Sequence, residues 1–336
     1  MTDHREYAPR SERGGVPGPD GPIVAVCCEG ASVLALFDLA TGDLLGSVPV
    51  GAHPVHATVA DGRVFVATMG ERSIDVVDTD GSVRRVEIGV LGPSHFAVAD
   101  GHLFVPCTAS DVVAVIDPVG LELEGRIAVG AEPHEIAVHD GLAYVGSRAD
   151  GVVSVVDTGA RETVGEVEIG PDARVQGVDI HPERGRGFAV DQRGARIVAF
   201  ELGSDPVPTG EAVVGADPYD LDICDDRVYV PGRGDGTVHE FGVDLGAPVV
   251  HEGFETPVQV VRYGGSSWVL DRGAARIVSL EGELFETPAP AIGGLATDSG
   301  MVLSHYDDAT VSLVDPPAGI SWQREAPDHP FGAVVV

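Results

Sequence analysis

An internal repeat of about 40 residues constrains the fold of this chain more than any other feature. A strand that ends in a short acidic turn recurs eight times, for example as IDVVDTDG (74–81) and VAVIDPVG (113–120). An apolar strand precedes each of these, and a further strand before it opens in most repeats with Gly-x-x-Pro. Alternating apolar and polar residues, together with Asp-Gly turns, predict four short antiparallel strands per repeat. The predicted first strands start, at intervals of 35 to 43 residues, near Pro54, Pro93, Pro133, Val175, Pro218, Pro257, Ile292 and Pro330.

A four-stranded repeat of this length is too small to bury both faces of its own sheet. Stacking eight such sheets around an axis buries those faces and leaves only short edges exposed. The sequence therefore predicts an all-β fold, a single β-propeller of eight four-stranded blades. Seven blades are the alternative if the irregular segment 175–215 is misread, and a tandem solenoid is a more distant alternative.

The two ends of the chain carry complementary parts of one repeat. Residues 330–336 (PFGAVVV) supply only a first strand, whereas residues 23–51 supply only the other three. We therefore expect the last strand to pair with the N-terminal strands and close the ring. The predicted domain spans residues 23–336. Residues 1–22 are rich in Gly, Pro and charge and are predicted to be a disordered lead-in.

Composition restricts the partners of this protein. The net charge is −32, and all 21 basic residues are arginine. Such a chain repels nucleic acid and anionic membranes, so neither is an expected partner. No stretch approaches the roughly 18 apolar residues that span a bilayer, and residues 1–22 lack the apolar core of a secretion signal. We therefore expect a cytoplasmic protein; the sequence leaves its oligomeric state open.

The repeats resemble the YVTN-type β-propeller repeat. The best matches are GAEPHEIAVHDGLAYVGS (130–147) and GADPYDLDICDDRVYVPG (215–232), and the resemblance covers about residues 23–336. Proteins similar to this pattern include the eight-bladed cytochrome d1 domain, virginiamycin B lyase, lactonases and metal-binding propellers. The resemblance thus implies the fold, while the activities it implies are diverse.

Equivalent positions at the start of each first strand are expected to converge around the propeller axis. One such ring holds His56, His95, Glu135, Gly177, Asp220, Gln259, Gly294 and Gly332. The position before it holds Val55, Ser94, His134, Gln176, Tyr219, Val258, Gly293 and Phe331.

The first of these rings predicts a metal site. Imidazoles and a carboxylate are ligands for a divalent transition metal, such as Zn, Cu, Fe or Mn. The predicted ligands are His56, His95 and Glu135, with His53 and His329 from the entering loops. An ordered water network or a histidine cluster that binds an organic ligand is the alternative.

A second ring, after the second strand of each repeat, is rich in arginine. Guanidinium groups bind carboxylate or phosphate, so this ring predicts a small anionic ligand. The predicted ligand-binding residues are Arg148, Arg193, Arg233 and Arg272, with Gln259 from the first ring. The alternative is that these arginines form salt bridges with Asp191, Asp271 or acids in the loops.

Together the two clusters predict a metal-dependent lyase, hydrolase or oxidoreductase that acts on a small anionic molecule at the mouth of the propeller. His134, Tyr219 and Asp220 are the candidates for proton transfer. The alternative function is non-catalytic: a metal carrier or an interaction scaffold.

Overall fold

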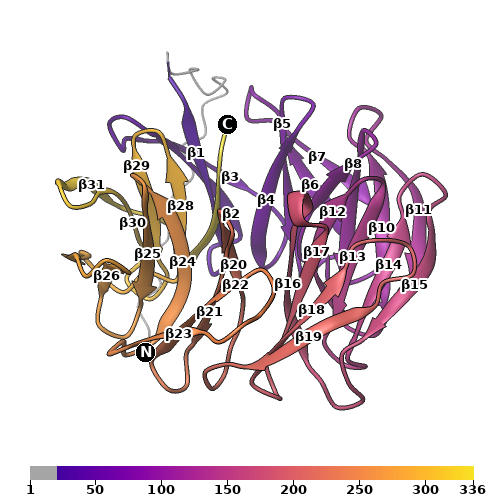
Figure 1. Cartoon of the computed structure of the whole chain (residues 1–336). Coiled ribbons are helices and arrows are strands. Elements are labelled where there is room, and N and C mark those ends of the chain that lie inside the picture. Colours follow the sequence, from indigo (N-terminus) through magenta and orange to yellow (C-terminus); the bar gives the residue numbers. More distant parts are fainter. Residues whose placement is uncertain (1–20) are drawn as a thin grey trace, which may run out of the picture.

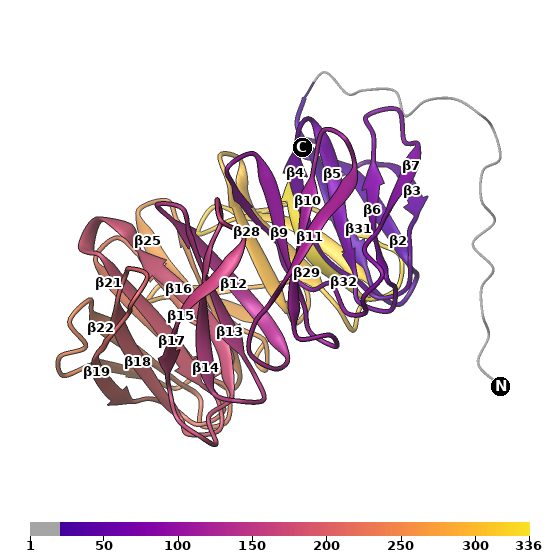
Figure 2. The same cartoon turned by 90° about the vertical axis from the view of Figure 1, so that its right-hand side faces the viewer.

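The computed structural model describes residues 21–336 as eight four-stranded antiparallel sheets arranged in a ring, an eight-bladed β-propeller (Figures 1 and 2). The predicted eight blades are confirmed, and the segment 175–215 forms a regular blade. The first twenty residues of the predicted disordered segment 1–22 lie outside the described residues. Within residues 21–336, no helix is long and apolar enough to cross a membrane.

Blades are numbered along the chain, and their strands run from the channel outward. Blades 1 to 4 comprise β4 (Pro54–Ala60), β5 (Arg63–Thr68), β6 (Ser73–Val77) and β7 (Val83–Glu87); β8 (Ala97–Ala99), β9 (His102–Cys107), β10 (Val112–Asp117) and β11 (Glu122–Ala128); β12 (Pro133–His139), β13 (Leu142–Ser147), β14 (Val152–Asp157) and β15 (Glu162–Glu168); and β16 (Val175–His181), β17 (Arg186–Asp191), β18 (Arg196–Glu201) and β19 (Pro208–Val213). A short 3-10 helix, η1 (Pro182–Arg184), joins β16 to β17.

The second half of the ring repeats this order. Blades 5 to 8 comprise β20 (Asp222–Cys224), β21 (Arg227–Gly232), β22 (Thr237–Gly242) and β23 (Val249–Glu252); β24 (Pro257–Tyr263), β25 (Ser266–Asp271), β26 (Arg276–Ser279) and β27 (Leu284–Glu286); β28 (Gly293–Thr297), β29 (Gly300–His305), β30 (Thr310–Asp315) and β31 (Gly319–Glu325); and β32 (Pro330–Val335), β1 (Ile23–Cys28), β2 (Val33–Asp38) and β3 (Leu44–Pro49).

Blade 8 closes the ring by joining the two ends of the chain. The last strand, β32, pairs antiparallel with β1, with Ala25 opposite Val334. Figure 1 shows this last, yellow strand running beside the indigo N-terminal blade. Trp322 of blade 7 adds a further link, because its indole N–H donates a 2.9 Å hydrogen bond to the carbonyl oxygen of Leu39 in blade 8.

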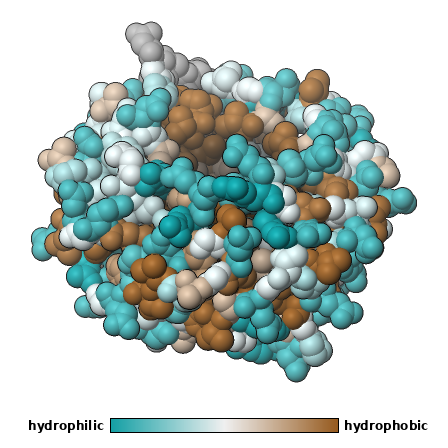
Figure 3. Space-filling model, viewed as in Figure 1, coloured by the Kyte–Doolittle hydropathy of each residue, from teal (hydrophilic) through white to brown (hydrophobic). Residues whose placement is uncertain are grey.

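The core of this protein is distributed between the blades. Each of eight clusters of buried apolar residues in the described chain joins two neighbouring blades. The cluster between blades 1 and 2, for example, packs Phe65 and Ile74 against Leu103 and Val105. Burial of these alternate strand residues is the main stabilising contribution to a stacked-sheet fold. The surface seen in Figure 3 is mostly hydrophilic, with hydrophobic residues in a hollow in its upper part and in smaller patches below.

The glycine of the Gly-x-x-Pro motif lets the entering loop lie close against its own blade. A Cβ atom at Gly51 would lie 2.7 Å from Glu71, and one at Gly130 would lie 2.7 Å from Val152. Only glycine permits such an approach without displacing its neighbours. The motif thus fixes where each innermost strand begins.

Candidate functional site

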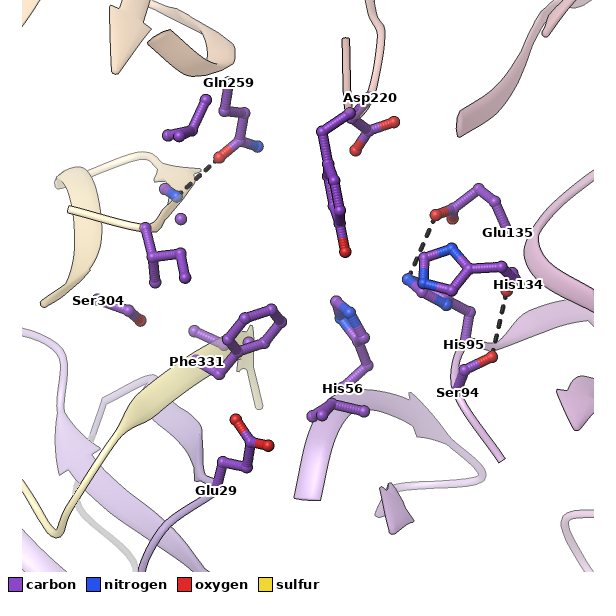
Figure 4. A pocket seen from close by; sticks show the side chains of 18 of the residues that line it. Glu29, His56, Ser94, His95, His134, Glu135, Asp220, Gln259, Ser304 and Phe331 are labelled. Atoms are coloured by element: carbon purple, nitrogen blue, oxygen red, sulfur yellow. Dashed lines mark hydrogen bonds and ion pairs between the residues drawn. The ribbon is translucent and has the colours of Figure 1, made fainter. Parts of the chain in front are cut away.

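The innermost strands surround a cavity of about 450 Å³ on the propeller axis. All eight blades contribute to its wall, and the lining includes every residue at the two adjacent positions that open the first strands, except Gly177. Repeat-equivalent residues therefore meet around one shared opening. Figure 4 shows His56, His95, His134 and Glu135 directed toward this space, with Phe331 facing them from another side.

An irregularity at the start of the innermost strands turns two consecutive side chains toward the channel. In blade 3, Pro133 pairs with Ser147 and Ile136 pairs with Val145, so that two residues face the single residue Gly146. Such a β-bulge interrupts the alternation of side chains between the two faces of a strand. It allows both His134 and Glu135 to line the cavity. Similar register shifts occur at the entrances of blades 1, 4, 6 and 8.

Blades 2 and 5 depart further from the regular pattern. In blade 2 an isolated bridge at Pro93 precedes a strand that starts only at Ala97. In blade 5 the corresponding bridge lies at Pro218 and the strand starts at Asp222. The unpaired stretches carry His95 in one blade and Tyr219 with Asp220 in the other.

Three of the side chains form a cluster that could hold a metal ion. We call these residues, His95, His134 and Glu135, the metal-ligand cluster. One potential ligand atom each from His95, His134 and Glu135 lies within 4.8 Å of the others. The His95 Nε2 atom is 3.2 Å from Oε2 of Glu135. His56 lies beside this cluster, with its ring centroid 4.1 Å from that of His95. The structure thus brings two of the five predicted ligands, His95 and Glu135, together with His134, and it places His56 beside them.

The environment of the cluster favours uncharged side chains. Burial lowers the pKa of His95 to about 4 and lowers the pKa values of His56 and His134 well below their ordinary range. Burial, and secondarily the charge of Asp179, raise the pKa of Glu135 to about 8. Neutral imidazole is the form that ligates metals. The Nδ1 atom of His95 is buried and has no hydrogen-bond partner among the described residues.

Asp220 and Tyr219 lie on the wall formed by blade 5. Burial, and then the nearby charge of Glu135, raise the pKa of Asp220 to about 8. Burial also raises the pKa of Tyr219, whose ring lies 4.2 Å from the guanidinium carbon of Arg233. A carboxyl group that titrates near neutrality can both accept and donate a proton.

The four predicted arginines occupy different environments. Arg148 lines the cavity. Arg233 pairs with Asp217 at 3.1 Å, and Arg272 pairs with Asp307 at 2.6 Å. Arg193 is exposed and donates a hydrogen bond to the carbonyl oxygen of Asp172. Asp191 and Asp271, offered in the sequence as alternative partners, pair with Arg196 and Arg276 in their own blades.

His53 and His329 lie apart from the metal-ligand cluster. Each precedes the proline that opens its strand and adopts a left-handed backbone conformation, with φ values of 53° and 58°. His53 contacts Glu29 at 3.2 Å and has an exposed side chain. His329 stacks on Tyr306 with a centroid distance of 4.4 Å. This turn geometry keeps both imidazoles out of the cavity lining.

Gln259 has a partly structural role. Its side-chain oxygen accepts a 2.8 Å hydrogen bond from the backbone N–H of Gly294 in the next blade. The side-chain oxygen is therefore engaged, while the residue still lines the cavity.

One side of the cavity, formed by blades 7 and 8, was not predicted from the sequence. The wall formed by blades 7 and 8 is mostly apolar, although Ser304 and Glu29 also belong to it. We call its apolar part, which consists of Ile292, Leu295, Val302 and Phe331, the apolar wall. Gly293 belongs to the same surface, and a Cβ atom placed there would meet no atom within 4 Å. The sequence contained a signal for this wall, because Gly293 and Phe331 occupy the same repeat position as His134.

Comparison with known proteins supports the fold. No protein-family model matches the sequence, and no curated protein matches it. Among solved structures, apo AztD from Citrobacter koseri is 13% identical, with a TM-score of 0.66, and the match covers 94% of this chain and 97% of that one. Dihydro-heme d1 dehydrogenase NirN in complex with DHE is 12% identical, with a TM-score of 0.75 and coverage of 97% and 76%. Kuenenia stuttgartiensis hydrazine synthase is 14% identical, with a TM-score of 0.60 and coverage of 86% and 100%. At these identities the similarity supports the propeller fold alone, and the YVTN type of the repeat stays a prediction.

Proposed function

We propose that the axial cavity is the active site of a metal-dependent enzyme that acts on a small anionic molecule. The observation that carries this proposal is the convergence of His95, His134 and Glu135 within 4.8 Å on the wall of the cavity. Two imidazoles and one carboxylate with further positions open is a ligand set that catalytic transition-metal sites use.

The residues around the cluster supply the other parts of such a site. A divalent metal would polarise a substrate oxygen or activate a water molecule. Asp220 lines the same cavity and is the candidate for proton transfer, with Tyr219 beside it. Arg148 offers a cation for the anionic group of the substrate. Hydrolysis and elimination fit this set best, because a Lewis acid and a proton-transfer group can promote both reactions.

Metal analysis of the purified protein tests the proposal. The parent protein, purified without chelators, should contain about one equivalent of a transition metal such as Zn, Cu, Fe or Mn. His95→Ala and His134→Ala should lose it, whereas His53→Ala should keep it as the matched control. Equal metal content in all four proteins would overturn the metal site. A parent protein that turns over none of the anionic substrates tried, together with Asp220→Asn and Arg148→Gln variants that keep the metal, would point to another function. That result would favour a non-catalytic metal-binding protein.

The expected setting of this activity belongs to the same proposal. We propose a cytoplasmic enzyme whose partner is a small molecule rather than nucleic acid or a membrane. The acidic composition supports this, as do four free cysteines, of which Cys27, Cys28 and Cys107 are buried. Burial raises the pKa of Cys28 and of Cys107 to about 12, so that both thiols stay protonated and unreactive.

A further inference from the structure

Two arginines near the cavity stand out among the cations of this chain. The described residues 21–336 include 18 arginines, and 16 of these donate a hydrogen bond or form an ion pair through their side chains. The other two, Arg148 and Arg174, have no such partner among the described residues. In a chain with 53 acidic residues and only 21 basic ones, acids to pair with them are abundant.

The guanidinium groups of these two residues are also partly withdrawn from water. Both side chains are half-buried, and the Nε atom of each is buried without a hydrogen-bond partner. A buried, unsatisfied N–H group costs about 1–3 kcal/mol, so native structures rarely keep one without a reason. A ligand that accepts hydrogen bonds would remove this cost.

The two arginines lie on neighbouring blades beside the cavity. Arg148 directly follows β13 in blade 3 and lines the cavity, while Arg174 directly precedes β16 in blade 4. Arg174 is close enough to His134 and Tyr219 for its charge to lower the pKa of both side chains. Its backbone carbonyl accepts a 2.9 Å hydrogen bond from the N–H of Gln192, which anchors it at the mouth.

The apolar wall lies across the channel from this pair. In a ring of eight, blades 7 and 8 stand four positions from blades 3 and 4, which is directly opposite. The cavity thus has a cationic side and an apolar side, with the metal-ligand cluster between them on blades 2 and 3. Phe331 of the apolar wall also borders His56, with the two ring centroids 5.5 Å apart (Figure 4).

We propose that Arg148 and Arg174 together bind the anionic group of an amphipathic organic anion. Its apolar part packs on the apolar wall, and its middle lies beside the metal-ligand cluster. This inference rests on the proposed function, because it names the ligand class of the same cavity. Planar guanidinium groups bind carboxylate and phosphate through paired hydrogen bonds, and the opposite wall selects molecules with a hydrocarbon body.

Calorimetric titration of metal-free protein tests this inference, with the chelator removed beforehand because chelators are themselves anions. The probes are butanoate, hexanoate and octanoate, with hexyl phosphate as a second anionic head and hexanamide as the neutral control. We expect affinity to rise about fourfold for each methylene group that the wall buries. Hexanamide should bind at least about tenfold more weakly than hexanoate.

Variants separate the two sides of the cavity. Arg148→Gln and Arg174→Gln should weaken binding of all the anions about tenfold to hundredfold. Arg84→Gln, at an exposed arginine on the outer strand β7, should change nothing. Gly293→Val should weaken octanoate more than butanoate, because it narrows the apolar side. Thermal unfolding of each variant shows whether the fold is kept.

Three results would overturn the inference: no binding of any of the anions, equal affinity for hexanoate and hexanamide, or unchanged affinity in both arginine variants. Binding of hexyl phosphate alone would support it and identify the head group. The metal proposal is tested independently, because these titrations use metal-free protein. If no histidine variant loses its metal, the metal proposal fails while the titration results still stand.

Discussion

The Nε2 atom of His95 lies 3.2 Å from the Oε2 atom of Glu135, across the boundary between blades 2 and 3. The two residues are 40 positions apart, which is one repeat, and they occupy equivalent sites in successive blades. Burial lowers the pKa of His95 to about 4 and raises that of Glu135 to about 8. In the metal-free protein the pair is therefore a close contact between uncharged groups at neutral pH.

A double-mutant cycle should detect this contact. In metal-free protein, His95→Ala, Glu135→Gln and the double variant should give a coupling free energy of about 0.5–1.5 kcal/mol at pH 7, because the contact is sheltered from water. Guanidinium denaturation measures it. The control cycle is His53→Ala with Glu29→Gln, a pair at the same distance whose imidazole is exposed. A coupling no larger than that of the control would contradict the assignment.

Asp220→Asn should stabilise the protein at high pH. The unfolded Asp titrates near pH 4, whereas the buried folded carboxyl group titrates near 8. Between these values the folded state holds more protons, so the free energy of unfolding of the parent falls as pH rises. The variant lacks this loss. Above pH 8 its Tm should therefore exceed that of the parent, by about 2–4 °C for each kcal/mol of difference in the free energy of unfolding. Near pH 4 the two Tm values should converge. Thermal unfolding between pH 4 and 9 measures this, and Asp298→Asn, at an exposed turn, is the control. Parallel pH profiles for the parent and Asp220→Asn would contradict the raised pKa of the Asp220 carboxyl group.

Deleting residues 330–336 should abolish the cooperative fold. It removes β32, leaves the buried strand β1 without its neighbour and takes Phe331 from the cavity. We expect loss of the sharp thermal transition, or association through the exposed edge, as seen by circular dichroism and size-exclusion chromatography. A variant that starts at residue 21 keeps every described strand and should behave as the parent. A monomeric, cooperatively folded truncation would show that closure is dispensable.

Neighbouring arginines in blade 6 should differ in their effect on stability. Arg276 bonds to the buried carboxylate of Asp271 at 2.8 Å and to the carbonyl oxygen of Gly253 at 2.7 Å. Arg276→Gln should therefore cost about 1–3 kcal/mol in the free energy of unfolding. Arg272→Gln breaks only a pair with the exposed Asp307 and should cost less than about 1 kcal/mol. Chemical denaturation of both variants measures this difference, and equal costs would refute it.

The fold and the position of the site were predictable for one reason. Repeat-equivalent residues of a propeller share a distance from the axis, so the periodicity alone indicates which side chains line the channel. His95, Glu135 and Asp220 could therefore be placed on the cavity wall from the sequence. His134 could be placed there without knowledge of the bulge that admits it, because it occupies the adjacent position of the repeat.

The roles of the arginines were not predictable in the same way. Whether Arg272 is available to a ligand depends on Asp307, which lies on the next blade and is brought near by the ring. Arg174 was overlooked because it precedes the first strand rather than following the second. His53 and His329 belong to the motif at the strand entrances, directly before the proline. Their side chains do not point into the cavity, because their left-handed backbone conformation turns them aside.

The entrances of the innermost strands separate the cavity lining from the folding core. Five blades (1, 2, 3, 5 and 6) each present two adjacent side chains to the cavity, and these positions lie outside the apolar inter-blade clusters, apart from partial contacts such as that of Val258. Exchanging such a pair would alter what the channel holds at little cost to the architecture. A chain built this way can acquire a new specificity one blade at a time, which makes the entrance pairs the natural targets for redesigning it.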